Sequence, residues 1–389
     1  MNYQKNFWAI FILTTVACTQ EPLASPKVSP PDREISAISE IVEMSGLEFI
    51  GEARLPTGLI YENTELGGIS GITYDANQQK YYAISDDRSQ KAAARFYGLK
   101  IELSPVRVLP EINVNTLLDE SQQPFAPGTL DPEAIALSNQ QTLWISSEGD
   151  SASSDRYANR NGQIIPWIKE FSLKGEHIKT LPIPEKYIPY AQNTKGVRNN
   201  LSLESLTITP NQQWLFTATE NALIQDGSPA DINQGSPSRI LQYNLLTRKP
   251  EKEFLYVTEP VADAPNPPES LHTNGLVELL AINETHLLSL ERSYSNGVGN
   301  TILLFEVSLA NASDIQTIDS LSSVDISQIK PAEKRLLLDL RSLNIPLDNI
   351  EAMTFGPILP DGRRSLILIS DNNFNPLQVT QILAFALSD

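Results

Sequence analysis

A repeated pattern constrains the fold of this chain more than any other feature of its sequence. Five segments share an alternating apolar run, a turn, and a second strand-like run that ends in an acidic residue. They are GGISGITYDANQQKYYAISDD from Gly67, DPEAIALSNQQTLWISSEGD from Asp131, SLESLTITPNQQWLFTATEN from Ser202, GLVELLAINETHLLSLERS from Gly275 and NIEAMTFGPILPDGRRSLILISDNN from Asn349. Regular self-similarity of this kind indicates a repeat architecture, in which each repeat is one small structural unit.

Acidic residues recur at two positions of the repeat. Aligning the first strands places Ser70, Glu133, Glu204, Glu278 and Glu351 in one column. Aligning the ends of the second strands places Asp86, Glu148, Glu220, Glu291 and Asp371 in another. Each repeat therefore carries a carboxylate at both positions, except the first, which has Ser70 together with the Asp86-Asp87 pair.

Two further strands complete each repeat. Third strands are predicted at 95–103, 167–173, 238–245, 301–309 and 380–387, and fourth strands at 107–114, 177–184, 253–259 and 335–340. The last repeat reaches the end of the sequence before its fourth strand, and residues 49–56 have the right character to supply it. We therefore predict an all-β fold, a β-propeller of five four-stranded blades closed by the N-terminal strand. Six blades is the alternative, because the loops between such long repeats could hold extra strands.

The charge balance narrows the classes of function. The chain has 47 Asp and Glu against 29 Lys and Arg, a formal net charge of -18. Such a chain lacks the basic face of a nucleic-acid binder, and it is disfavoured for electrostatic docking on anionic lipid. One Cys excludes an intramolecular disulfide and a Cys-based zinc site, and three His leave little for His-based chemistry. Carboxylates and the Arg and Lys set remain as the chemical groups of a site.

The N-terminus predicts export. Residues 1–17 have a basic Lys5 and a short apolar run, Phe7 to Leu13, which is too short to span a bilayer. The segment resembles a bacterial lipoprotein signal, in which Cys18 becomes the lipidated first residue, although Thr15 replaces the usual Leu. A plain secretory signal is the alternative. We predict a Pro- and Ser-rich tether over 18–45 and the propeller over 46–389. The expected location is the cell envelope or periplasm, anchored only through Cys18, or else secreted and soluble.

The repeated acids predict a metal site. The two acidic positions are antiparallel neighbours in each hairpin, so they should converge on one end of the ring, where their repulsion requires neutralisation. Oxygen ligands in number favour Ca²⁺. The candidate ligands are Asp86, Asp87, Glu133, Glu148, Glu204, Glu220, Glu278, Glu291, Glu351 and Asp371. The alternative is structural: each Glu bonds backbone N–H groups of the adjacent blade, and the paired acids form turns.

Three arginines are candidate catalytic residues. Arg88 follows the Asp86-Asp87 pair, Arg292 follows Glu291, and Arg198 precedes the strand of Glu204. Arg is a preferred bidentate partner of phosphate and carboxylate, so these side chains could capture an anionic substrate beside a metal. Internal salt bridges to the neighbouring acids are the alternative.

The same segments resemble a known family. The stretches GGISGITYD…YYAISDDRS, ARFYGLKIEL, DPEAIAL…ISSEGD, GVRNNLSLESLTITP, LERSYSNGVGNTILLFEV and DNIEAMTFGP…SDNNFNPLQVTQILAFAL resemble the phytase-like, "esterase-like activity of phytase" family of bacterial exported proteins. The resemblance runs from about Gly46 to Asp389. It implies a β-propeller with phosphoesterase or esterase activity.

These observations lead to one principal hypothesis, a Ca²⁺-dependent phosphoesterase of the phytase-like kind at the cell envelope. It would be a monomer acting on a small phosphorylated or ester substrate, with the metal activating water and the arginines stabilising the developing charge. Two rivals remain open: a non-catalytic propeller that binds a ligand or protein, and a lactonase or carboxylesterase that uses a metal.

Overall fold

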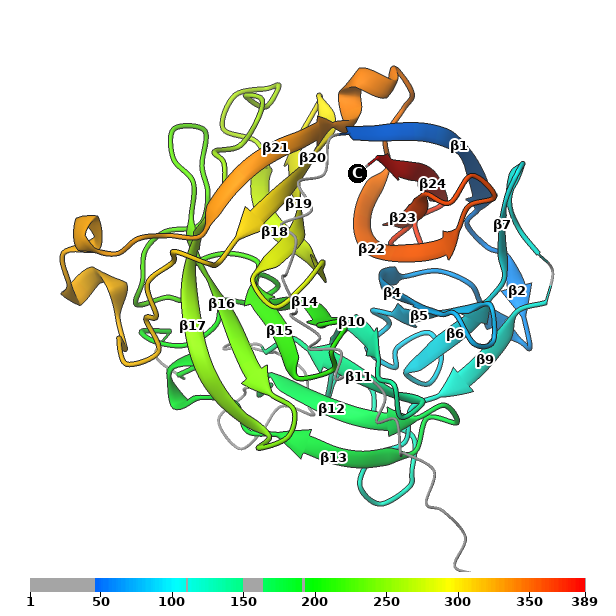
Figure 1. Cartoon of the computed structure of the whole chain (residues 1–389), viewed down its shortest axis with the longest axis horizontal. Coiled ribbons are helices and arrows are strands. Elements are labelled where there is room, and N and C mark those ends of the chain that lie inside the picture. Colours follow the sequence, from blue (N-terminus) through cyan, green and yellow to red (C-terminus); the bar gives the residue numbers. More distant parts are fainter. Residues whose placement is uncertain (1–45, 110, 150–163, 191–192, 389) are drawn as a thin grey trace, which may run out of the picture. The chain divides into compact units, whose positions relative to one another are not determined.

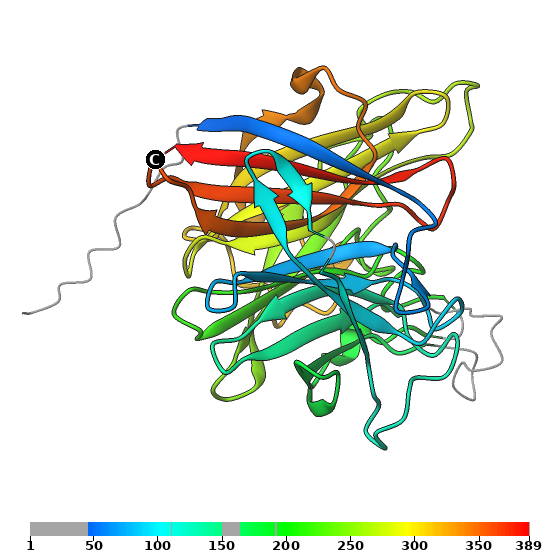
Figure 2. The same cartoon turned by 90° about the vertical axis from the view of Figure 1, so that its right-hand side faces the viewer.

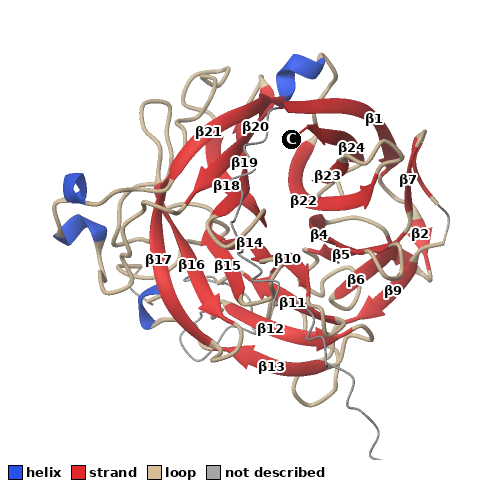
Figure 3. Ribbon diagram, in the orientation of Figure 1, coloured by secondary structure: helices blue, strands red, loops and turns tan. Residues whose placement is uncertain are grey.

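The computed structural model describes residues 46–109, 111–149, 164–190 and 193–388. The predicted signal, Cys18 and the tether lie outside the described residues. Within the described part, five four-stranded antiparallel sheets surround a common centre (Figures 1 and 3), and the helical elements are four short 3₁₀ turns. This confirms the predicted five-bladed β-propeller and replaces the six-bladed alternative.

Each blade has one inner strand and three successive outer strands. Blade 1 consists of β4 (Ile69–Asp75), β5 (Lys80–Ser85), β6 (Arg95–Leu99) and β9 (Asn113–Thr116). Blade 2 consists of β10 (Pro132–Leu137), β11 (Thr142–Ser147), β12 (Trp167–Ser172) and β13 (His177–Leu181). Blade 3 consists of β14 (Leu203–Ile208), β15 (Trp214–Thr219), β16 (Pro237–Asn244) and β17 (Lys249–Val257). Blade 4 consists of β18 (His272–Ala281), β19 (His286–Ser295), β20 (Gly299–Ser308) and β21 (Glu333–Asp339). Blade 5 consists of β22 (Asn349–Ile358), β23 (Arg364–Asp371), β24 (Val379–Ser388) and β1 (Gly46–Pro56).

The ring closes through its first strand. β1 is the outermost strand of blade 5 and pairs antiparallel with β24, from Gly46 opposite Ser388 to Pro56 opposite Val379. Figure 2 shows the two strands, from opposite ends of the chain, running side by side. Blade 5 thereby gains its fourth strand, as the sequence predicts.

Apolar side chains fill the space between neighbouring blades. Alternate side chains of a strand point to opposite faces of its sheet, so each blade can pack on both sides. One core cluster joins Ile72, Ala83 and Tyr97 of blade 1 to Ile367 and Ile382 of blade 5. Complete burial of a large apolar side chain contributes about 1.5–3 kcal/mol, so these interfaces hold the inner strands in fixed positions around the centre.

The outer edge of blade 1 differs from the prediction. The predicted fourth strand at 107–114 is divided between β8 (Val106–Val108) and β9, and β8 pairs with β7 (Ile101–Leu103) in a separate hairpin. Ile101 and Val106 of this hairpin belong to the core cluster between blades 1 and 5. Their apolar side chains are therefore buried against the neighbouring blade, and this leaves β9 to complete the sheet.

A segment of blade 4 covers the outer edge of blade 3. Residues 310–332 connect β20 to β21, and within them Ile315 and Ala332 donate backbone hydrogen bonds to Glu253 and Leu255 of β17, both at 2.8 Å. An outermost strand otherwise presents unpaired backbone groups. The segment satisfies part of this edge.

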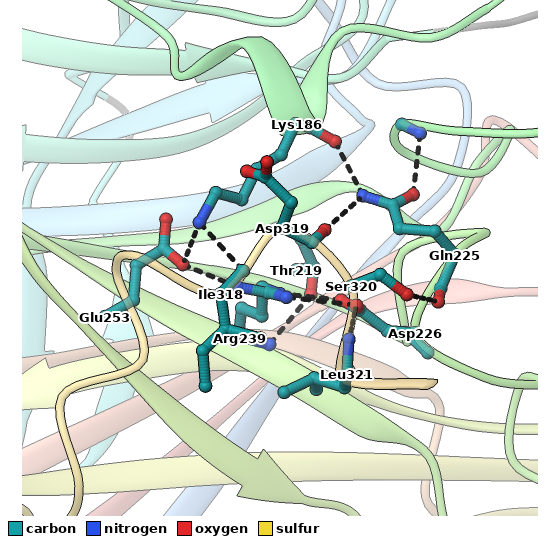
Figure 4. A network of polar contacts seen from close by, with 12 residues as sticks. Lys186, Thr219, Gln225, Asp226, Arg239, Glu253, Ile318, Asp319, Ser320 and Leu321 are labelled. Atoms are coloured by element: carbon teal, nitrogen blue, oxygen red, sulfur yellow. Dashed lines mark hydrogen bonds and ion pairs between the residues drawn. The ribbon is translucent and has the colours of Figure 1, made fainter. Parts of the chain in front are cut away.

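A buried ion-pair network fixes that segment (Figure 4), and its members are Lys186, Asp226, Arg239 and Glu253. Arg239 donates to Asp226 Oδ2 at 2.6 Å and to Glu253 Oε2 at 2.7 Å, while Lys186 Nζ lies 3.2 Å from the same Glu253 oxygen. Asp226 in turn accepts from the backbone N–H of Leu321 at 2.8 Å. The two positive and two negative side chains neutralise one another, so the network has no net charge with which to attract a ligand. Its role is to hold residues 310–332 against blade 3.

Candidate functional site at the acidic end of the ring

An irregularity of the inner strands builds the site. In every blade, the pairing of the inner strand with the second strand shifts register near the start of the inner strand, as in a β-bulge. Just before the shift, one residue of the inner strand pairs with a residue near the end of the second strand. These pairs are Ile69 with Ser85, Pro132 with Ser147, Leu203 with Thr219, Leu276 with Glu291 and Ile350 with Ser370. An extra residue in a strand changes the direction of the local side chains. The same device therefore aims side chains at one end of the ring in every blade.

Two sets of equivalent residues follow from these pairs. The residues next along the inner strands are Ser70, Glu133, Glu204, Val277 and Glu351. The residues next along the second strands are Asp86, Glu148, Glu220, Arg292 and Asp371. The register thus corrects the sequence alignment by one residue in blade 4, where Val277 and Arg292 replace Glu278 and Glu291.

Glu278 and Glu291 consequently lie outside the acidic set. Glu278 accepts backbone hydrogen bonds from Leu279 at 2.9 Å and from Leu206 of the adjacent blade at 3.4 Å. This is the structural role that we considered as the alternative for each Glu. Glu291 accepts a hydrogen bond from Tyr256 Oη, on the outermost strand of blade 3, at 2.7 Å. It also forms a 2.7 Å ion pair with Lys334, on the outermost strand of its own blade.

Asp87 and Arg198 also have other partners. The carboxylate of Asp87 forms a 2.7 Å ion pair with the buried Arg95 and accepts three backbone N–H bonds from the turn that follows. These bonds lower its pKa against the opposing effect of burial. Arg198 donates to the backbone carbonyls of Ala222 at 3.0 Å and Gly227 at 2.5 Å. Both side chains therefore organise loops around the site.

Eight carboxylates do gather at this end of the ring, and we call them the acidic cluster. Its members are Asp86, Asp131, Glu133, Glu148, Glu204, Glu220, Glu351 and Asp371. Asp131 was missed as a candidate ligand. It lies two residues before Glu133 in the segment DPEAIAL, and a comparison of all five repeats at this second upstream position would have singled it out, because the sequence alignment has Gly68, Ser202, Leu276 and Asn349 there in the others.

Burial changes the protonation of the acidic cluster. Loss of solvent, reinforced by neighbouring carboxylates, raises the pKa of Asp86 to about 7. Burial likewise raises the pKa of Glu220 to about 7 and that of Asp131 to about 6, although nearby arginines oppose both shifts. The pKa values of Glu133, Glu148, Glu204 and Asp371 are raised well above their usual range, first by burial and then by like charges, and that of Glu351 is also raised. Without added positive charge, the cluster is therefore held partly protonated at neutral pH.

Two arginines meet the acidic cluster from different sides. Arg88 forms an ion pair with Asp131 and donates to Asn200 Oδ1 at 2.9 Å, and 30% of its side chain stays exposed. Arg292 reaches Glu220 and Glu351, each at 3.3 Å, and donates to Asn349 at 3.0 Å. Eight carboxylates against two guanidinium groups leave the cluster strongly acidic.

Part of the acidic cluster has the geometry of a cation site. Asp131, Glu133 and Glu148 each offer a carboxylate oxygen, and these three atoms lie within 4.8 Å of one another. One oxygen of Glu148 accepts from the backbone of Ser202, whereas its buried Oε2 has no hydrogen-bond partner among the described residues. An unpaired buried carboxylate oxygen is unfavourable unless a cation or a proton satisfies it. An all-oxygen donor set of this kind fits a hard divalent cation such as Ca²⁺ or Mg²⁺.

The arrangement places this candidate cation site next to a partly exposed guanidinium, that of Arg88. A divalent cation and an arginine at adjacent positions attract the same groups, the negatively charged oxygens of a substrate. Such a pair can bind an anionic ester and stabilise charge that develops on its oxygens.

Residues 64–374 match the family model "Phytase-like: Esterase-like activity of phytase". A relative from Arthroderma benhamiae, named "Uncharacterized secreted protein", is 25% identical over 153 residues, which cover 33% of this chain and 27% of that protein. Of the described residues, none belongs to a helix long and apolar enough to cross a membrane.

Several solved structures resemble the fold at low identity. They are the Dos1 propeller (8% identity, TM-score 0.34, 83% of this chain and 69% of that chain), a GH43_12 protein retrieved from a capybara gut metagenome (10%, 0.40, 88% and 57%) and a protein of unknown function from Dyadobacter fermentans (12%, 0.36, 86% and 87%). At these TM-scores the likenesses carry no argument about function.

Proposed function

This chain belongs to the phytase-like family, whose model is described by esterase-like activity, and from that premise we propose that it is a cation-dependent phosphoesterase. The proposed site is the acidic cluster at one end of the propeller, and the proposed substrate is a small phosphorylated molecule. We further propose that the chain is exported through residues 1–17 and held at the cell envelope through Cys18 and the tether, because the sequence of this segment has the features of a lipoprotein signal.

The cation would be held by Asp131, Glu133 and Glu148. Their three oxygens are close enough to share one ion, and the buried Glu148 Oε2, which accepts no bond from a described donor, supplies a further ligand atom. Glu204 lies next to Glu148 and would support it. A divalent cation at this place would supply a Lewis acid for phosphoryl oxygens and lower the pKa of a water molecule.

Arg88 would hold the substrate. Its side chain is partly exposed, it is fixed by Asp131 on one side, and Asn200 from the following blade accepts a second bond at 2.9 Å. A guanidinium held in this way is oriented before substrate arrives, so little conformational entropy is lost when it binds an anionic oxygen. Its positive charge next to the cation site favours a doubly charged phosphate over a neutral ester.

The observation that carries the proposal is the close set of Asp131, Glu133 and Glu148 with one oxygen left unpaired. The test is hydrolysis of p-nitrophenyl phosphate and phytate by protein stripped with a chelator, before and after Ca²⁺ or Mg²⁺ is restored. We expect activity only with the cation, and loss of activity in Glu133→Gln. Activity that survives chelation would contradict the proposal.

A carboxylester or lactone panel belongs in the same experiment, because the family description names an esterase-like activity without a substrate. Hydrolysis of neutral esters, without hydrolysis of phosphate esters, would assign the site to the carboxylesterase or lactonase class. Arg88→Met separates a phosphoesterase from a carboxylesterase or lactonase. It should lower kcat/KM on phosphate esters by about 10²-fold or more, the scale for loss of one charge-stabilising donor, and lower kcat/KM on neutral esters far less.

A further inference from the structure

Arg292 occupies a ring position that carries an acid in every other blade. By strand register it is the equivalent of Asp86, Glu148, Glu220 and Asp371. The blade that supplies this guanidinium also has the apolar Val277 where three other blades have a glutamate. Blade 4 therefore contributes no carboxylate to the acidic cluster, and it contributes one fixed positive charge.

The contacts of Arg292 use the carboxylates of blades 3 and 5. The same nitrogen, Nη2, lies 3.3 Å from Glu220 and 3.3 Å from Glu351. Gly275, opposite Arg292 in the sheet, leaves the space for this approach: a Cβ there would lie 2.1 Å from Glu220 Oε1. Arg292 also interacts electrostatically with Glu204 and Asp371. Its guanidinium thus takes the place that a cation would have between these acids.

The carboxylates of blade 2 are arranged differently. Arg88 forms an ion pair with Asp131 from the exposed side and interacts electrostatically with Glu133 and Glu148, but among the described residues neither of these two glutamates forms an ion pair of its own. The unpaired Glu148 Oε2 belongs to this half of the acidic cluster. Glu148 of blade 2 therefore keeps an unpaired oxygen, whereas Glu220 of blade 3 and Glu351 of blade 5 form ion pairs with Arg292.

We infer that Arg292 is a built-in counter-cation that replaces a second metal ion, so that the chain binds a single divalent cation through Asp131, Glu133 and Glu148. This inference rests on the proposed function for the existence of a cation, and it adds the number of ions and their place. A second ion between Glu220 and Glu351 would have to displace or repel the guanidinium that already contacts both carboxylates. Cation binding in the acidic cluster is therefore confined to the side of blade 2.

The test is the stoichiometry of Ca²⁺ on the full-length, chelator-stripped protein, measured by equilibrium dialysis with metal analysis at neutral pH. We expect one Ca²⁺ per chain in the natural protein and in Arg292→Lys, which keeps the charge. Arg292→Gln should bind two. Two or more ions in the natural protein, or still only one in Arg292→Gln, would overturn the inference while leaving cation dependence intact. No Ca²⁺ in the natural protein would instead reject the proposed function.

A second measurement applies if Arg292→Gln does not fold. Glu133→Gln and Glu148→Gln should each lower the Ca²⁺ affinity by more than about 10-fold, since even residues that only support ligands act on that scale. Glu220→Gln and Glu351→Gln should lower it by less than about 10-fold, because their carboxylates face Arg292. An equal loss of Ca²⁺ affinity in the blade 2 variants and in the Glu220 and Glu351 variants would place the ion between these two sets of carboxylates and overturn the inference.

Discussion

Arg292 Nη2 lies 3.3 Å from Glu220 Oε1 across the boundary between blades 3 and 4. The ring position that bears a carboxylate in four blades bears a positive charge in blade 4, and the two groups occupy equivalent positions in adjacent blades. The acidic cluster is therefore unevenly neutralised, and its response to cations and to pH is open to direct measurement.

Divalent cations should stabilise the protein at neutral pH and have little effect near pH 5. The folded-state pKa values of Asp86 and Glu220 are raised to about 7, whereas unfolded Asp and Glu titrate near about 4. In the cation-free protein, their contribution is fully present below the unfolded values and is lost as the pH rises through about 7. The loss is about 1.4 kcal/mol per pH unit for each carboxyl group in this window.

Thermal unfolding from pH 5 to pH 8, with chelator and with Ca²⁺, checks this expectation. The melting temperature with chelator should fall as the pH rises, and Ca²⁺ should recover it at pH 7–8. Glu220→Gln is the control, since it should flatten the fall. A chelated protein that becomes steadily more stable up to pH 8 would contradict it.

Replacement of Glu278 should separate structural acids from those of the acidic cluster. Burial raises its pKa well above the usual range, which favours its neutral form in the folded protein, and its oxygen accepts backbone N–H groups of two blades. Glu278→Gln keeps an acceptor and should leave Ca²⁺ affinity unchanged. Glu278→Leu leaves buried donors without a partner and should lower the free energy of unfolding by about 1–3 kcal/mol.

The pH dependence gives this prediction a second readout. Because the folded pKa of Glu278 is raised, the stability gained by Glu278→Gln should grow as the pH rises above about 4.3, the value for unfolded Glu. Urea unfolding at pH 5 and pH 8 measures it. A Glu278→Gln protein that loses Ca²⁺ binding would mean that Glu278 is a ligand after all.

Loss of Arg239 should destabilise the propeller strongly. Its side chain is fully buried and joins Asp226 to Glu253, so Arg239→Met leaves two buried carboxylates with less positive charge. Breaking a buried ion pair from one side costs about 3–5 kcal/mol. The matched control is Arg107→Met, which removes a solvent-exposed pair with Glu102 and should leave stability almost unchanged, because water screens such a pair. Similar small effects in both proteins would show that the network is dispensable.

Truncation should locate the N-terminal boundary of the propeller. A chain that begins at residue 45 retains all of β1 and should fold with the stability of the full-length protein. A chain that begins at residue 57 loses the strand that pairs with β24, exposing the edge and part of a core cluster. We expect that chain to be insoluble or to lack a cooperative unfolding transition. Circular dichroism on both chains decides the matter.

The fold could be predicted because alternating apolar residues and acidic residues recur at the same positions of all five repeats. Alternation within the hairpins fixes the strands, and the absence of a fourth strand after 380–387 points to 49–56 for closure, as the pairing of Gly46 with Ser388 confirms. The hairpin of β7 and β8 could not be foreseen. Val106 and Ile101 look like strand residues in either arrangement, and only their burial against blade 5 distinguishes the two.

The sequence predicted the positions of seven of the eight carboxylates in the acidic cluster, but it missed Asp131, included Asp87, and placed blade 4 one residue out of register. In blade 4 the acids Glu278 and Glu291 satisfy the spacing of the repeat, but the bulge falls on Val277. A bulge depends on which backbone groups pair, and it does not change the spacing of the acids in the sequence. The sequence alignment of the repeats can therefore be wrong by one residue without showing a mismatch. Arg292 directly follows Glu291 in the sequence, but only the pairing of β18 with β19 shows that it is equivalent to the acids of the other blades.

The direction of β1 has a practical consequence for how the molecule is presented. Blade 5 ends its second strand at Asp371, in the acidic cluster, and β24 then runs away from that end to Ser388, opposite which β1 begins at Gly46. The chain thus enters the propeller on the side opposite the acidic cluster. Immobilising the propeller directly at the start of β1, on a sensor chip or a bead, should orient the cluster outward, where ligands arriving from solution meet it first.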